Sequence, residues 1–163
     1  MKKLLFSIVY LIFFTNSAAA LVEVDITRGN LDPLPIAVSP LYIEPGSKEI
    51  MQDGKVIKNI GEEISKVIEI NFKRSGLFNP LKKDSFVQNP DIAHLKPRFE
   101  DWKLIKAQAL VTGKVTISDN KLRAEFRLWD IVAAKEMTGL AFSTTPDNWR
   151  RVAHIISDKI YQR

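Results

Sequence analysis

The chain of 163 residues contains no cysteine. This absence excludes disulfide bonds, thiolate zinc sites, cysteine nucleophiles and a lipid anchor on an N-terminal cysteine. An apolar core must therefore hold the fold together without covalent cross-links. The composition allows such a core, because 45% of the residues are hydrophobic and 26% are charged. These proportions are typical of a globular domain and exclude extensive disorder.

Motifs of reaction chemistry are missing as well. The seven glycines are spread singly, so no glycine-rich loop is present to bind phosphate. The two histidines, His94 and His154, lie far apart in the sequence and belong to no metal-ligating pattern. Glu62 and Glu63 are neighbours on an expected helix and point apart, unlike the facing carboxylates of an acid/base pair. We expect neither enzyme activity nor a cofactor or metal site.

Positive charge is in modest excess, with 24 Lys and Arg against 19 Asp and Glu. Lys82-Lys83 and Arg150-Arg151 are isolated pairs without the interleaved aromatic residues of a base-stacking surface, so nucleic-acid binding is the least favoured hypothesis. Trp129 shares a predicted strand face with Arg123 and Arg127. A second packed face or a lid over the arginines is the favoured interpretation of Trp129, and a partner-binding hot spot is the alternative.

No apolar run is long enough to span a membrane. The run at residues 4–14 would reach about 16 Å as a helix, whereas the hydrocarbon core is about 30 Å thick. It follows two lysines and precedes Ala18-Ala19-Ala20, which is the order of a cleavable secretory signal. We expect residues 1–20 to be a signal peptide that is cleaved between Ala20 and Leu21, with cleavage after Ala19 as the alternative. Cleavage removes two lysines and lowers the net charge from +5 to +3.

Residues 21–35 combine a strand pattern with a stretch of helix and strand breakers. Apolar and acidic side chains alternate along Val22-Glu23-Val24-Asp25-Ile26, as in a strand with one buried face. Residues 29–35 contain a glycine and two prolines, and proline cannot donate a hydrogen bond to a sheet. We expect a mobile N-terminal strand and hinge that can dock or detach with little effect on the core.

Helical periodicity is clearest over residues 59–76. Apolar side chains recur at helical spacing from Ile60 to Phe72 and define one face of the segment. Asn59 is a typical N-cap residue, and Gly76 can adopt the left-handed conformation that ends a helix. This pattern predicts an amphipathic helix packed on a sheet.

The remaining elements complete an α/β domain over residues 36–163. We expect a short helix over residues 99–108 and a last helix with Thr145 as its N-cap and Pro146 in its first turn. Apolar and alternating patterns predict strands over residues 36–43 (with a bulge or an end at Pro40), 109–117, 121–129 and 136–144, and a hairpin turn at Asp53-Gly54. The fold class predicted is a small mixed β-sheet packed with two to three helices.

Five sequence motifs then point to a known family. They are PIAVSP at residues 35–40, KRSGLFNPL at 73–81, ALVTGKV at 109–115, FRLWD at 126–130, and WRRVAH at 149–154. In this order and spacing the motifs resemble the N-terminal domain of the TolB family, the periplasmic component of the Tol–Pal cell-envelope system. The resemblance implies a non-enzymatic periplasmic adaptor that supports outer-membrane integrity and envelope constriction during cell division, and that bacteriocins use for import.

The resemblance also implies a partner-binding segment. In the family, about the first dozen mature residues form a strand that the inner-membrane protein TolA recognises. The matching positions are Leu21, Val22, Glu23, Val24, Asp25, Ile26, Thr27, Arg28, Gly29, Asn30, Leu31 and Asp32. A six-bladed β-propeller that binds Pal follows this domain in the family. No repeats of forty-odd residues occur here, so we expect the propeller to be absent and Pal to lack its usual binding surface.

A second hypothesis belongs to another class of function. An exported module that binds a small ligand, or a degenerate enzyme, could have kept only the fold. This alternative predicts a deep pocket with convergent polar groups around Trp129, Arg123 and Arg127.

Overall fold

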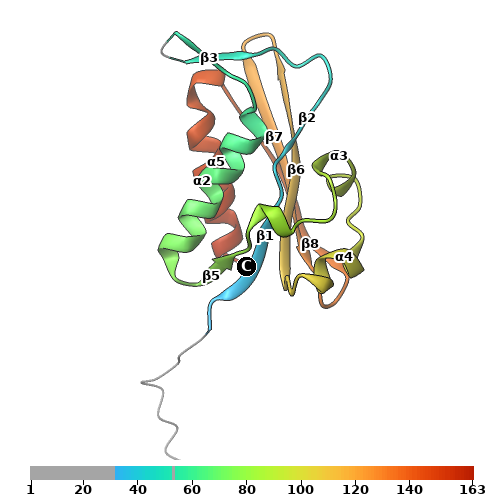
Figure 1. The fold of residues 1–163 in the computed structure, drawn as a ribbon. Coiled ribbons are helices and arrows are strands. Elements are labelled where there is room, and N and C mark those ends of the chain that lie inside the picture. The colour runs from blue at the N-terminus through green and yellow to red at the C-terminus, as the bar shows by residue number, and fades with distance from the viewer. Residues whose placement is uncertain (1–31, 53) are drawn as a thin grey trace, which may run out of the picture. The chain divides into compact units, whose positions relative to one another are not determined.

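The computed structural model describes residues 32–52 and 54–163 (Figure 1). The predicted signal peptide, its cleavage site and residues 21–31 of the predicted terminal strand lie outside the described residues. The strands are β1 (Leu34–Val38), β2 (Tyr42–Ile43), β3 (Ile50–Gln52), β4 (Lys55–Ile57), β5 (Phe78–Pro80), β6 (Ala109–Ser118), β7 (Lys121–Asp130) and β8 (Lys135–Thr144). The helices are α2 (Ile60–Ser75), α3 (Pro90–Ala93), α4 (Phe99–Leu104) and α5 (Trp149–Tyr161), with 3₁₀ turns η2 (Lys83–Ser85) and η3 (Pro146–Asn148).

Six of the described strands form one mixed sheet. Its order is β5-β1-β6-β7-β8. Both β1 and β2 pair with β6: β1 with its first residues, and β2 with residues farther along it. Strands β5, β1, β2 and β6 are parallel, whereas β6, β7 and β8 form an antiparallel meander. Strands β3 and β4 make a separate hairpin, and Gly54 in its turn has a φ of 73°. The predicted fold class is confirmed.

The strand predicted over residues 36–43 is divided into β1 and β2. Pro40, which has no N–H to donate, lies in the break between them. Leu41 is buried there, and its N–H donates to the Gly61 carbonyl of α2 at 3.2 Å. The Ser65 hydroxyl of α2 donates to the Ser39 carbonyl at 3.0 Å. The break is thus the point at which the sheet is bonded to the first long helix.

Helix α2 forms as its sequence predicts. The Asn59 side chain accepts a hydrogen bond from the Glu62 N–H at 3.1 Å, and Gly76 ends the helix with a φ of 71°. Both caps satisfy backbone groups that an isolated helix end leaves unpaired. Local chemistry therefore determines both ends of this element.

The other two predicted helices begin or end at different residues. The helix expected over residues 99–108 ends at Leu104, and Lys106 takes a left-handed φ of 61°. The last helix is preceded by the 3₁₀ turn η3, so that α5 begins at Trp149. The Thr145 hydroxyl accepts from the Asn148 side chain at 2.9 Å and caps no backbone N–H. Thr145 is therefore the N-cap residue of η3, with Pro146 in the first turn as predicted, whereas the N-cap residue of α5 is Asn148.

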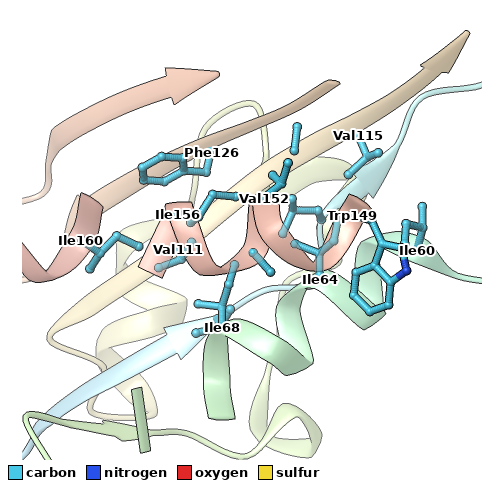
Figure 2. Close-up of a cluster of buried hydrophobic side chains, with 14 of the residues drawn as sticks. Ile60, Ile64, Ile68, Val111, Val115, Phe126, Trp149, Val152, Ile156 and Ile160 are labelled. Carbon is cyan, nitrogen blue, oxygen red and sulfur yellow. The ribbon is translucent and has the colours of Figure 1, made fainter. Parts of the chain in front are cut away.

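Helices α2 and α5 lie together on one face of the sheet (Figure 1). Their apolar side chains meet those of the central strands in the main core, as Figure 2 shows. The buried residues that it labels are Ile60, Ile64, Ile68, Val111, Val115, Phe126, Trp149, Val152, Ile156 and Ile160. This face of the sheet is closed by the two long helices.

Residues 81–108, which carry α3 and α4, lie on the opposite face (Figure 1). They form a smaller core with Leu110 and Trp129 of the sheet, in which Trp102 is fully buried. The cover reaches only part of the face. Farther along β6, β7 and β8, the side chains of Lys114, Arg123 and Ser143 remain partly or fully exposed.

Candidate functional site

Asp32 is the one residue of the predicted TolA-binding segment within the described part of the chain. It is exposed, and Pro33 after it is exposed as well. The next residue, Leu34, begins β1 and donates its N–H to the Leu77 carbonyl at 2.9 Å. Pro35 accepts a hydrogen bond from the Gln108 N–H at 2.9 Å. The segment is therefore attached to the start of a strand that is bonded on both sides.

The edge of the sheet beside this attachment point is short. Strand β5 pairs with β1 over three residues and ends at Pro80. Proline and short length both hinder a further strand from pairing with an edge. The chain after Asp32 is thus held by hydrogen bonds within the sheet, and the neighbouring β5 edge is poorly suited to pairing with a further strand.

A polar hollow of about 460 Å³ lies over the uncovered part of the second sheet face. Its charged lining residues are Glu44, Lys114, Glu125, Arg127 and Glu136. His94 and Leu95, which follow α3, form the wall toward the smaller core. The His94 ring stacks on the Tyr42 ring with centroids 4.3 Å apart, which holds this wall against β2.

The charges of the hollow are paired with one another. Lys114 Nζ lies 2.9 Å from Glu44 Oε2 and 3.9 Å from Glu125 Oε1. The hydrogen bond and the charge of Lys114 hold the pKa of Glu44 below its usual value, and the same hydrogen bond raises the pKa of Lys114. Arg127 contacts Glu136 at 3.6 Å and donates to the His94 carbonyl at 3.0 Å. Glu44 and Lys114 thus stabilise each other's charged forms.

Trp129 does not take part in this hollow. Its side chain is 7% exposed, and its ring meets Phe99 edge to face with centroids 5.9 Å apart. The indole N–H donates to the Thr112 hydroxyl at 2.8 Å. The interpretation of Trp129 as part of a second packed face is confirmed.

The pocket predicted by the small-ligand hypothesis is therefore not assembled as expected. Arg127 lines the hollow, Arg123 is an exposed residue that bonds to Glu125 at 3.2 Å, and Trp129 is buried elsewhere. Among residues 32–52 and 54–163, no three His, Asp or Glu side chains converge as metal ligands. The charged groups that line the hollow pair with one another, so few of them are left to bind a ligand.

The edge position of β8 was not predicted from the sequence. This strand has ten residues and pairs with β7 alone among the described strands. From Thr138 to Thr144 it contains neither a charged residue nor a proline. The sequence contains this pattern, but only the strand order reveals that the pattern lies at an edge.

Within the described part of the chain, no helix has the length and apolarity needed to cross a membrane.

A family model and a curated relative point to the same family. Residues 22–137 match the TolB amino-terminal domain family. The Tol–Pal system protein TolB of Pelagibacter ubique (strain HTCC1062) is 66% identical over 148 residues, which cover 90% of this chain and 33% of the relative. The chain thus spans about a third of the length of this curated relative.

Two solved structures share the fold. TolB from Acinetobacter baumannii matches with a TM-score of 0.61 and 18% identity, over 80% of this chain and 28% of that chain. Lipoprotein GNA1162 from Neisseria meningitidis matches with a TM-score of 0.52 and 17% identity, over 80% of this chain and 96% of the other. At these identities the likeness concerns the fold alone.

Proposed function

The chain belongs to the TolB family, whose amino-terminal domain it contains, and we propose that it acts as a periplasmic adaptor of the Tol–Pal system. TolB family proteins are non-enzymatic components of this system and are periplasmic. The predicted family and the predicted lack of enzymatic activity are confirmed by this membership. Export through a cleaved signal at residues 1–20 is part of the proposal.

The proposed partner is TolA, and the proposed binding segment is Leu21 to Asp32. The observation that carries this assignment is that the family match starts at residue 22 and so includes all of the segment except Leu21. The alternating side chains of Val22 to Ile26 suit a strand that adds to the edge of a partner's sheet. Its main-chain groups would supply hydrogen bonds, while Val22, Val24 and Ile26 would fill apolar sites on one face.

The domain behind the segment has a supporting role in this proposal. Leu34 is fixed by its hydrogen bond to Leu77, so a partner that captures residues 21–32 pulls on a folded domain. Competition between the domain and TolA for the segment would make this contact reversible. Through it the chain would contribute to outer-membrane integrity and envelope constriction at division, and bacteriocins could use the same contact for import.

Deletion of residues 21–32 tests the assignment. We expect the deleted chain to keep its cooperative unfolding, because β1 begins at Leu34, and to lose binding to the purified periplasmic part of TolA. Val24→Asp should weaken binding at least tenfold by placing a charge on the apolar face, since an unpaired charge is costly to bury. Glu23→Gln, on the other face, is the matched control. Unchanged TolA affinity in the deleted chain would overturn the assignment.

A further inference from the structure

A pocket of about 590 Å³ lies between the β3–β4 hairpin and the starts of α2 and α5. The hairpin is at the end of the domain where both helices begin (Figure 1). The charged residues that line the pocket are Lys55, Lys58, Arg150, Glu62 and Glu63. The pocket is distinct from the polar hollow, with which it shares no lining residue. Its volume is within the range of small-molecule binding sites.

Arg150 is held in position by two contacts. Its guanidinium carbon lies 4.2 Å from the centroid of the Trp149 ring, and its Nη1 donates to Gln52 Oε1 at 2.8 Å. The Trp149 side chain belongs to the main core (Figure 2) and is 1% exposed, so its ring is a fixed platform. A cation is favoured over the face of a tryptophan ring. The structure thus fixes the orientation of a planar, permanently charged donor group at the pocket.

The orientation of the Gln52 amide follows from its partners. Its Oε1 accepts from the Trp149 indole N–H at 3.0 Å as well as from Arg150. Both partners can only donate, so the oxygen must face them and the amide NH₂ is directed away from them. Lys55 is the partner of Gln52 in the hairpin register, and cross-strand partners are neighbours on one face of a strand pair. Arg150, Gln52 and Lys55 therefore form a set of donors beside the pocket.

The charges of the pocket are not balanced. Lys66, which is outside the lining, pairs with Glu62 at 3.2 Å and with Glu63 at 2.8 Å. Among the described residues, no carboxylate pairs with any of the three cations of the lining. The polar hollow differs in this respect, since its charges pair with one another. The pocket is left with an excess of positive charge, and an anion is the complementary ligand.

We propose that this pocket binds a phosphate group. A phosphate monoester carries more negative charge than a carboxylate and offers three strong acceptor oxygens, which suits a pocket with three cations and an amide donor. Arginine donates to phosphate through a matching fork, and lysine adds a point charge. The start of α2 is not the proposed site, because the Asn59 side chain already accepts from the Glu62 N–H at 3.1 Å. Inorganic phosphate and the headgroup of a phospholipid both have the required chemistry.

An NMR titration of the isotope-labelled chain tests the site. Sodium phosphate would replace sodium chloride at constant ionic strength and neutral pH. We expect saturable shifts, largest for the amides of residues 52–58 and 149–150. Arg150→Gln and Lys55→Gln should each weaken binding at least tenfold. Arg151→Gln is the matched control, because it removes the same charge from the next residue, which is exposed and outside the pocket lining.

A variant with the opposite effect separates binding from folding. Glu63→Gln should tighten phosphate binding severalfold, because it removes a like charge from the pocket lining, and a general loss of structure could not have this result. Three results would overturn the proposal: no saturable shifts with phosphate, equal weakening by Arg150→Gln and Arg151→Gln, or an equal response to sodium acetate.

Vesicle flotation distinguishes the two sources of phosphate. The chain would be mixed with phosphatidylcholine vesicles that contain or lack phosphatidic acid, whose headgroup is a phosphate monoester. Binding that needs phosphatidic acid, and that Arg150→Gln removes but Arg151→Gln retains, would identify a lipid headgroup as the ligand. Saturable binding of inorganic phosphate without vesicle binding would identify free phosphate. Either result supports a phosphate site in this pocket.

Discussion

At the scale of single residues, two glycines mark places where backbones approach too closely for any side chain. A Cβ at Gly61 would overlap the carbonyl oxygen of Leu41, and a Cβ at Gly113 would overlap the carbonyl oxygen of Glu125. Both obstacles are backbone atoms, which cannot move aside without shifting a strand or the chain between strands. Gly61 therefore sets how closely α2 approaches the break between β1 and β2.

Gly61→Ala should lower the free energy of unfolding by about 1–3 kcal/mol, the usual cost of overpacking. The loss should occur although alanine favours helices by about 1 kcal/mol over glycine. Urea denaturation followed by circular dichroism measures it. Ile70→Ala in the same helix is the control, since Ile70 is mostly exposed and surface changes cost within about 0.5 kcal/mol. Equal stability of the two variants would contradict the close contact.

Two glutamates should respond to pH in opposite directions. Burial raises the pKa of Glu69, and Lys83, 3.4 Å away, offsets this only in part. The Glu69 carboxylate is therefore costly in the folded state, and this cost is relieved as the pH falls through its raised pKa. Glu44 has a lowered pKa because of Lys114, so its contribution to stability is present at neutral pH and is lost as the pH falls through that lowered value.

Unfolding free energies at pH 7, at about pH 4.5 and at about pH 3 would test these signs. As the pH is lowered, the native chain should gain stability relative to Glu69→Gln, because glutamine cannot take up the relieving proton. Relative to Glu44→Gln, the native chain should lose stability at still lower pH. Each variant serves as the control for the other. Parallel pH profiles for both variants would contradict the assigned environments.

At the scale of elements, residues 81–108 form a cover with little regular structure. Gln88 fixes this cover from within: it is 3% exposed, and its side-chain oxygen accepts from the Trp102 indole N–H at 3.0 Å and from the Arg98 N–H at 2.9 Å. One buried amide thus joins the chain before α3 to α4.

Gln88→Ala should open the cover while leaving the α2–α5 core folded. Leaving the buried Trp102 N–H and the partly buried Arg98 N–H without an acceptor costs about 1–3 kcal/mol. Limited proteolysis within residues 81–108 should therefore become roughly tenfold faster. Asn89→Ala is the matched control, because Asn89 is exposed and its side chain caps no helix. Unchanged cleavage of Gln88→Ala, or a loss of cooperative unfolding of the whole domain, would contradict this role.

Elements with local signals could be predicted, and elements defined by distant partners could not. Helix α2 carries its periodicity and both caps within one segment, and β6, β7 and β8 form as their patterns predict to within one or two residues. Strand β5 has three residues and exists because β1 lies beside it. Glu44 and Lys114 pair in the hollow although they are seventy residues apart in the sequence. No local sequence pattern could predict this pair.

At the scale of the whole described domain, the two faces of the sheet have different roles. One face is closed by α2 and α5 around the main core (Figure 2). The other is half covered by residues 81–108, with a self-paired polar hollow beyond them. The polar groups of this described hollow are paired with one another. Such a domain suits an adaptor that binds its partner through a segment outside the hollow. The proposed binding segment is the N-terminal one, residues 21–32.

The central claim is that residues 21–32 bind TolA and that the domain carries them. Transfer of the segment tests this claim most directly. Residues 21–32 would be fused to an unrelated soluble carrier, and the binding of purified periplasmic TolA would be measured by calorimetry for this fusion and for residues 33–163 alone. We predict that the fusion binds TolA and that residues 33–163 do not. Binding by residues 33–163, with none by the fusion, would contradict the account.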